Sequence, residues 1–268
     1  MRGYTKEERD KIKSERLNQQ TTTNQGYTVK CICYNTARDI IVEFQDKHKA
    51  RVHTSWQKFQ DGGILNPYHP KQHGGIKGDK YLSIIDGIFV KEYVSWENML
   101  MRCLDKKEKE RDKSVTYKEA VCCKEWLLYE NFYEWIHNQE NFDKWLNGKF
   151  TLDKDILVKG NKIYSPETCC LVPENVNKLF IKHGNARGKY PIGVVYHKAS
   201  NSFVAQAHDG TGKQVHLGCY DTPEKAFQAY KKYKENLIKQ VAEVEYKNGN
   251  ITKECYEAMI NYIVEIDD

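Results

Sequence analysis

The segment from Leu152 to Asn177 holds the side chains best suited to chemistry. It runs Leu-Asp-Lys-Asp-Ile, a Lys-Gly-Asn-Lys turn, Tyr-Ser-Pro-Glu-Thr-Cys-Cys and then Val-Pro-Glu-Asn-Val-Asn-Lys. Carboxylate and amide oxygens of this kind are the hard ligands that Mg²⁺ or Mn²⁺ prefers. Taken alone, the segment favours a plainer interpretation, in which Asp153 and Asp155 are hairpin residues and Asn175 or Asn177 caps a helix.

The residues before this segment predict a helical scaffold. From Ser95 onward, apolar residues recur at helical spacing, and the pattern continues after the charged stretch Asp105–Lys113. The residues of this pattern are Trp96, Met99, Leu100, Cys103, Trp126, Tyr129, Phe132, Tyr133, Ile136 and Trp145. We interpret them as core packing that supports the segment at 152–180. The chain has no CxxC or HxxxH pair, which argues against a structural zinc site.

The residues after this segment change to a period of two. Three short strands are predicted at Ile192–Tyr196, Ser202–His208 and Gln214–Tyr220. A long helix then begins at Thr222-Pro223-Glu224, because threonine suits the N-cap and proline the first helical position. Asn248-Gly249 ends this helix, and a last short helix is predicted at 252–263.

The first ninety residues predict a basic leader and a small β module. Tyr27–Tyr34 and Asp39–Phe44 are β-branched and aromatic runs separated by Asn35–Arg38, as in a hairpin. Gly62–Gly75 is rich in Gly, Pro, Asn and His, which is typical of a loop. A small barrel that helps to grip DNA, a spacer and a partner-docking domain all remain open for this module.

The composition allows a polyanionic partner without requiring one. The chain has 268 residues and a formal net charge of +5, with a mean hydropathy of −0.77. It shows neither the apolar run of a membrane helix nor that of a signal peptide, so no membrane partner is expected. The nine cysteines are partly adjacent or alternating, which indicates reduced thiols. We therefore expect a cytoplasmic protein, in a bacterial host if it is phage encoded.

The expected fold class is α+β with three domains. Residues 1–92 are assigned to the leader and β module, 93–186 to the central domain and 187–268 to the C-terminal sheet and helices.

The C-terminal domain resembles the AP2-type DNA-binding domain, a three-stranded sheet backed by one helix. The resemblance from Tyr190 to Ala242 is carried by four marks in order: Ile192-Gly193-Val194, Phe203-Val204-Ala205, Leu217-Gly218-Cys219-Tyr220 and Thr222-Pro223-Glu224-Lys225-Ala226-Phe227. It implies a sheet that lies in the major groove of double-stranded DNA. The chain lacks the arginines and tryptophan usual in the strands of that family.

Strand alternation gives a set of candidate DNA-binding residues. If Val195 and Phe203 are packing residues, the candidates are Tyr196, His197, Lys198, Gln206, His208, Lys213 and His216. Glutamine can bond adenine at two points, whereas lysine and histidine more often touch phosphate. Arg187–Lys247 holds ten Lys or Arg against six Asp or Glu, as a phosphate-binding surface requires. A solvated helix face is the alternative source of this charge, since several of the lysines lie in Lys231–Lys239.

The segment at 152–177 resembles the HNH core, also called the ββα-metal or His-Me finger, of phage nucleases. The resemblance implies that Asp153 and Asn177 bind one divalent cation, Mg²⁺ or Mn²⁺, beside the scissile phosphate. Lys154 stands where the catalytic histidine of that family usually lies, and Thr168 where an asparagine often orients it. A phosphate clamp suits Lys154 better than a base, since free lysine is protonated at neutral pH. Asp155 or a water molecule would then supply the base.

These resemblances imply a metal-dependent DNA endonuclease, homing-like or phage encoded, in which 95–185 cut and 190–245 recognise the target. A non-cleaving DNA-binding regulator or accessory protein with a decayed HNH core is the alternative, and an interaction module centred on residues 25–90 is a third possibility. The target sequence, nicking versus double-strand cutting and the oligomeric state are left open by the sequence.

Overall fold

The computed structural model describes residues 5–104, 119–181, 189–266 and 268. These residues form several small sheets with helices, so the structure is of mixed α and β class. The charged stretch Asp105–Lys113 lies outside the described residues. The chain divides into two compact units, one with residues up to Ile88 plus Leu127–Glu130, the other with Phe89–Trp126 and Asn131–Asp268.

The first unit is built on a four-stranded antiparallel sheet in the order β1-β2-β3-β4. Its elements are α1 (Lys6–Arg16), β1 (Gln20–Thr22), β2 (Thr28–Thr36), β3 (Asp39–Phe44), β4 (Arg51–Thr54), α2 (Trp56–Gln60) and β5 (Ile84–Ile85), which pairs with β6 (Ile88–Phe89). The hairpin predicted from the sequence is confirmed as β2 and β3. The β-branched and aromatic residues of these strands alternate between a buried and a more exposed face.

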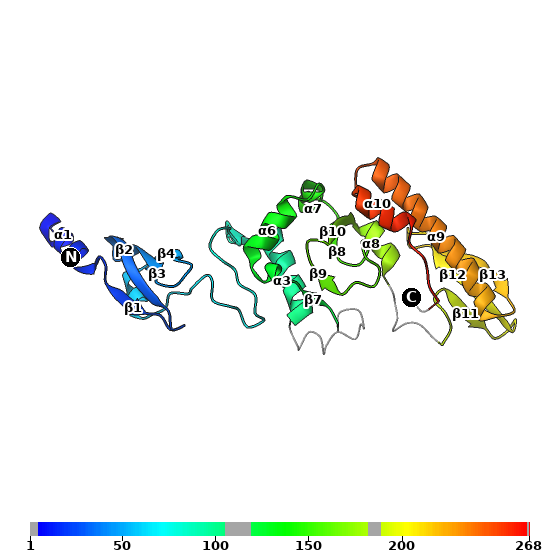
Figure 1. Cartoon of the computed structure of the whole chain (residues 1–268), viewed down its shortest axis with the longest axis horizontal. Coiled ribbons are helices and arrows are strands. Elements are labelled where there is room, and N and C mark those ends of the chain that lie inside the picture. Colours follow the sequence, from blue (N-terminus) through cyan, green and yellow to red (C-terminus); the bar gives the residue numbers. More distant parts are fainter. Residues whose placement is uncertain (1–4, 105–118, 182–188, 267) are drawn as a thin grey trace. The chain divides into compact units, whose positions relative to one another are not determined.

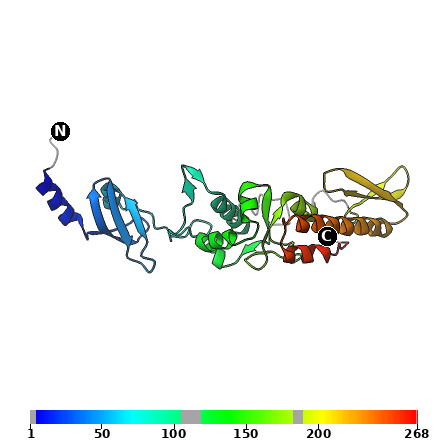
Figure 2. The same cartoon turned by 90° about the horizontal axis from the view of Figure 1, so that it is seen from above.

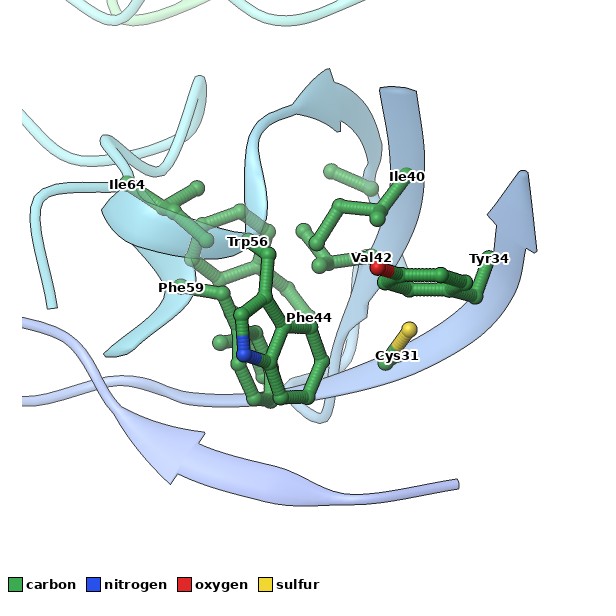
Figure 3. Close-up of a cluster of buried hydrophobic side chains, with 10 residues drawn as sticks. Cys31, Tyr34, Ile40, Val42, Phe44, Trp56, Phe59 and Ile64 are labelled. Carbon is green, nitrogen blue, oxygen red and sulfur yellow. The ribbon is translucent and has the colours of Figure 1, made fainter. Parts of the chain in front are cut away.

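One face of this sheet carries the core of the first unit. Figure 3 shows Val42 and Phe44 from β3 facing Trp56 and Phe59 from α2, with Tyr34 beside them. The Tyr34 and Trp56 rings meet edge to face at 5.7 Å between centroids. Aromatic side chains bury a large apolar area each, which lets so small a sheet form its own core.

The second unit begins with the aromatic scaffold and the strands that follow it. Its elements are α3 (Lys91–Leu104), β7 (Val121–Cys122), the 3₁₀ helix η1 (Glu125–Leu127), α6 (Tyr129–His137), α7 (Phe142–Asn147), β8 (Phe150–Asp153), β9 (Ile163–Tyr164), β10 (Cys170–Pro173) and α8 (Glu174–Phe180). Of these, the end of η1 and the start of α6, Leu127–Glu130, group with the first unit. Trp96 is fully buried, and its indole N–H donates to the Trp126 carbonyl at 2.7 Å. The prediction that these aromatic residues pack in a core is confirmed.

The C-terminal part of this unit is a three-stranded antiparallel sheet with two helices. Its elements are β11 (Val194–His197), β12 (Ser202–His208), β13 (Gln214–Tyr220), α9 (Pro223–Lys247) and α10 (Lys253–Ile260). Thr222 caps α9 through its hydroxyl, as predicted. In Figures 1 and 2, β11–β13 lie along the beginning of α9, and α10 folds back beside its end.

Helix α9 takes part in two hydrophobic cores. Phe227 and Tyr230, in its first half, pack with the sheet residues Val194 and Ala205. Ile238 and Ala242, in its second half, pack with residues of β10, α8 and α10. The sequence separated the central and C-terminal parts at residue 186, whereas the structure groups them in one compact unit.

Two further sequence expectations, on the cysteines and on membrane helices, can be compared with the structure. All nine cysteines lie among the described residues and are free, as the adjacent pairs predicted. Among the helices that the structure describes, none is long and apolar enough to cross a bilayer.

Candidate functional site

The predicted catalytic residues lie on a β-hairpin followed by a helix. β8 pairs antiparallel with β10, and this register sets Asp153 opposite Cys170. α8 begins directly after β10 and packs against both strands. Val176 and Leu179 anchor it in the core that it shares with α9 and α10. Asp153 and Asn177 thus lie on elements that pack against each other, β8 and α8.

Asp153 is the last residue of β8 and is buried, with 8% of its surface exposed. Its Oδ1 accepts the backbone N–H groups of Asp155 and Ile156, each at 2.8 Å. Burial and, to a smaller extent, the nearby Asp155 charge raise the pKa of this carboxyl, the two backbone bonds and the Lys154 charge oppose the rise, and the result is a pKa of about 6. The buried carboxylate therefore costs free energy when it ionises, although it also closes the turn after β8.

Lys154 points its ammonium into the loop that follows β8. Only 5% of its side chain is exposed, and Nζ donates to Asp155 Oδ2 at 3.0 Å and to the Asn161 carbonyl at 3.1 Å. Asn161 in turn donates to the Lys154 carbonyl at 2.6 Å and to the Ile163 carbonyl at 2.7 Å. This network occupies the lysine, so its position favours a role in holding the loop over a role as base or phosphate clamp.

Thr168 and Asn177 complete the predicted set. The Thr168 hydroxyl donates to the Ile163 carbonyl at 2.7 Å and lies 3.1 Å from the Ser165 hydroxyl. These bonds fix the loop before β10 and leave Thr168 without the orienting contact to Lys154 that the resemblance implies. Asn177 lies half-buried on α8, the helix that packs against β8 and β10.

The donor set suits a hard divalent cation with few protein ligands. Within the part of the chain that the structure describes, no group of three or more His, Cys, Asp or Glu is arranged to hold a metal ion. Mg²⁺ is often bound through one or two protein oxygens while it keeps several waters. In the described hydrogen-bond network, both bonds to Asp153 go to Oδ1, which leaves Oδ2 available as such an oxygen. This carboxylate oxygen is of the type that such binding uses.

His137, the nearest histidine before this segment, is held in other contacts. His137 lies 2.9 Å from the buried Glu92 carboxylate, and its ring packs between Tyr133 and Phe142 with centroids 4.0 Å from each. These contacts make His137 a packing residue. His183 lies outside the described residues.

The β11–β13 sheet has one face on α9 and one open face. Register pairs Val195 with Val204, and Gln206 with His216. A bulge at Leu217-Gly218 shifts the pairing between Ala205 and Gln206, and Gly218 adopts a φ of +123° there. The face turned away from α9 carries His197, Gln206, His208 and His216 from the predicted set, together with Val195, Val204, Gln214 and Cys219.

The alternation assumed from the sequence is wrong at two positions. Val195 is 46% exposed and belongs to the open face rather than to the packing side. Tyr196 therefore lies on the side of Phe203, with its ring 5.2 Å from that ring and its hydroxyl donating to Asn201. Lys198 and Lys213 lie in the two turns at the ends of the strands, both exposed.

Two groups of residues escaped the sequence interpretation. The first is Lys234, which interrupts a buried series at every fourth position of α9, namely Ala226, Tyr230, Ile238 and Ala242. That spacing was the signal that could have revealed it. The second is a set of basic residues on β4 and on the loop after α2, which only the folded loop brings together.

Comparison with known proteins adds no relative: no family model, no curated protein and no solved structure matches the chain.

Proposed function

We propose that the chain binds double-stranded DNA with the open face of β11–β13 and hydrolyses a phosphodiester bond at the β8–β10–α8 unit. The observation that carries the proposal is that α9 packs into the core of both parts. At 25 residues, this helix is about 37 Å long. The helix would thereby hold the DNA-binding sheet at a fixed distance and orientation from the hydrolytic residues, as cutting at a chosen position requires.

The open face of the sheet supports the recognition half of the proposal. Gln206 and His216 lie side by side across β12 and β13, where a two-stranded ribbon can reach base edges in the major groove. Lys198 and Lys213 in the turns can reach the phosphates on either side. Exposed polar residues on one face and an apolar opposite face are what such a DNA-binding sheet requires.

In the hydrolytic half, Asp153 and Asn177 would hold one Mg²⁺ or Mn²⁺. That cation, when bound, supplies a Lewis acid that stabilises charge on the phosphate oxygens. Lys154 is not placed to take a proton, because its ammonium donates to Asp155 and to the Asn161 carbonyl. Asp155, whose side chain is 35% exposed, follows Asp153 closely in the chain and is the proton acceptor we assign.

A plasmid assay tests both halves together. The purified chain is incubated with supercoiled plasmid and Mg²⁺, Mn²⁺ or EDTA, and its binding to the same DNA is followed by gel shift. We expect metal-dependent nicked or linear product and a shifted band. Shifted DNA without product would support the non-cleaving regulator instead. Neither signal would reject both DNA functions and turn attention to the N-terminal module.

A further inference from the structure

The first unit has a groove with a basic lining, and this groove plays no part in the proposed DNA contact of the β11–β13 sheet. It encloses about 710 Å³. Arg51 and His53 line it from β4, and His69, Lys71 and Lys77 line it from the loop after α2. Among the described residues that line the groove there is no aspartate or glutamate. Arg51 and His53 are two residues apart on the edge strand of the sheet, so both side chains project to the same exposed side.

The loop that forms the other wall is a fixed structure. Residues 61–83 contain no helix or strand apart from a single bridge at Ile76. Loops of this length inside a compact unit are usually functional or disordered. This one is ordered around Asn66, which is 4% exposed and donates from its amide to Asp46 at 2.7 Å. The Asn66 backbone N–H also donates to Gln25 Oε1 at 2.8 Å, and its side-chain oxygen accepts from the Tyr68 N–H.

The same loop holds two lysines close together. Burial lowers the pKa of the Lys77 ammonium, the charges of Asp79 and Glu130 partly offset this, and the charge of Lys71 adds a smaller lowering. The Glu130 Oε1 also accepts the backbone N–H groups of Asp79 and Lys80 at 2.8 Å each. A half-buried ammonium costs free energy to desolvate, and a bound anion would recover part of that cost.

The acidic partners of β4 are weak competitors for such an anion. Arg51 pairs with Glu43 at 3.0 Å and His53 lies 3.6 Å from Asp39; the Arg51 and His53 side chains are mostly exposed, at 68% and 74%, whereas that of Glu43 is 20% exposed. Exposed ion pairs contribute little to stability. A phosphate in the groove can therefore share the exposed Arg51 guanidinium with Glu43.

We propose that this groove binds the phosphodiester backbone of DNA, as a contact separate from the β11–β13 sheet. A row of cations along an open groove, with the amides of Gln25 and Gln72 beside them, suits a chain of phosphates. The choice of DNA as the polyanion rests on the proposed function. A second contact on the same chain would add to the first through a raised effective concentration.

The experiment titrates the ¹⁵N-labelled full chain with a twelve-base-pair duplex at low salt. We expect the amide signals of Arg51, His69 and Lys77 to move with saturable dependence on DNA. Signals of Gln206 and His216 report the sheet in the same spectra, so failure of the groove and failure of the sheet are distinguished. A groove that does not respond to the duplex overturns the inference, whatever the sheet does. A groove that responds to decaglutamate and not to DNA overturns it as well.

Paired variants then measure the number of phosphates. In Lys71→Gln/Lys77→Gln, the slope of log affinity against log salt should become shallower by about two, since each released phosphate contact contributes about 0.9. The control Lys47→Gln/Lys58→Gln removes the same charge from exposed positions of the same unit outside the groove. An equal change in the control would show a general charge effect and reject the groove. Because the wild-type titration needs no substitution, the inference stays testable even if the double variant folds poorly.

Discussion

The β8–β10–α8 unit and the β11–β13 sheet treat their polar residues in opposite ways. Asp153 and Lys154 are buried and hydrogen-bonded to the loop that follows β8. On the sheet, His197, His208 and His216 are exposed on the open face. Burial of charged residues therefore lowers the stability of the β8–β10–α8 unit, whereas the exposed histidines of the β11–β13 sheet have no such cost.

The difference shows that a buried charged residue is stronger evidence of function than an exposed one. A buried carboxylate is costly, so its presence calls for a physical reason, either the turn that it closes or a cation that it binds. An exposed histidine costs nothing and carries meaning only through its place on the sheet. The predictions below separate stability from function in each region.

The largest effect is expected from Asp153→Asn in the buried region. We expect metal-dependent cleavage to disappear, because the variant loses the charged ligand, while DNA binding persists. The amide oxygen can still accept from Asp155 and Ile156, so the turn should survive. At neutral pH the variant should be more stable by up to about 3 kcal/mol, the cost of ionising a carboxyl with a pKa near 6 in the fold and 3.8 when unfolded.

The pH dependence of the free energy of unfolding tests whether the ionised Asp153 carboxylate destabilises the fold. A raised pKa means that the folded wild type is favoured while the carboxyl is protonated, and that this advantage is lost as the pH rises from 3.8 to about 6. The gain of Asp153→Asn should therefore be present at pH 7 and absent near pH 4, as measured by urea unfolding. The exposed Asp143→Asn serves as control. A less stable Asp153→Asn at pH 7 would show that the carboxylate has a partner that the amide cannot replace.

Local patterns predicted much of the sheet region. β12 and β13 have the predicted bounds, and α9 begins at Pro223 as predicted. These features were predictable because strand alternation and helix capping depend on residues that are neighbours in the sequence. β11 instead begins at Val194 and the last helix ends at Ile260, each within a few residues of expectation. Boundaries depend on packing as well as on propensity.

Long-range packing was beyond the sequence. The apolar stripe of α9 shows that one face is buried, but not that its second half packs with α8 and α10. The burial of Lys154 depends on Asn161 and the loop between β8 and β9. At Val195, alternation gives two faces without saying which of them meets the helix, and the wrong one was chosen.

A second prediction concerns a substitution that destabilises only the contact between the β11–β13 sheet and α9. Gly193 adopts a φ of +74°, and a Cβ there would lie 2.1 Å from Tyr230 Cδ2 on α9. Gly193→Ala should lower the free energy of unfolding by about 2–4 kcal/mol, from the left-handed backbone and from overpacking. Gly212→Ala is the matched control, since its φ is +98° and no heavy atom lies within 4 Å of a Cβ. Thermal unfolding measures both, and equal losses would contradict the close approach of β11 to α9.

A third prediction tests which face of the sheet meets DNA. Gln206→Ala and His216→Ala should each weaken binding about 5- to 100-fold, because a good contact to a base edge is worth roughly 1–3 kcal/mol. Tyr196→Phe, on the face with Phe203, should change affinity less than twofold. Fluorescence anisotropy with a selected target duplex measures all three. A larger effect at Tyr196 than at Gln206 would mean that the open face is not the binding face.

The smallest expected effect lies where the two regions meet on α9. Burial lowers the pKa of Lys234, and no hydrogen bond or ion pair joins its ammonium to another residue that the structure describes. Lys234→Met should therefore raise the free energy of unfolding by about 1 kcal/mol at pH 7, since it replaces an uncompensated charge by an apolar side chain of similar length. A lowered pKa penalises the protonated folded state, so the gain should shrink as the pH rises towards 10.5. Lys239→Met, at an exposed position of the same helix, should change stability by less than about 0.5 kcal/mol. A loss of stability in Lys234→Met would show that the ammonium is compensated, and a simultaneous loss of DNA affinity would assign it to phosphate binding between the sheet and the hydrolytic unit.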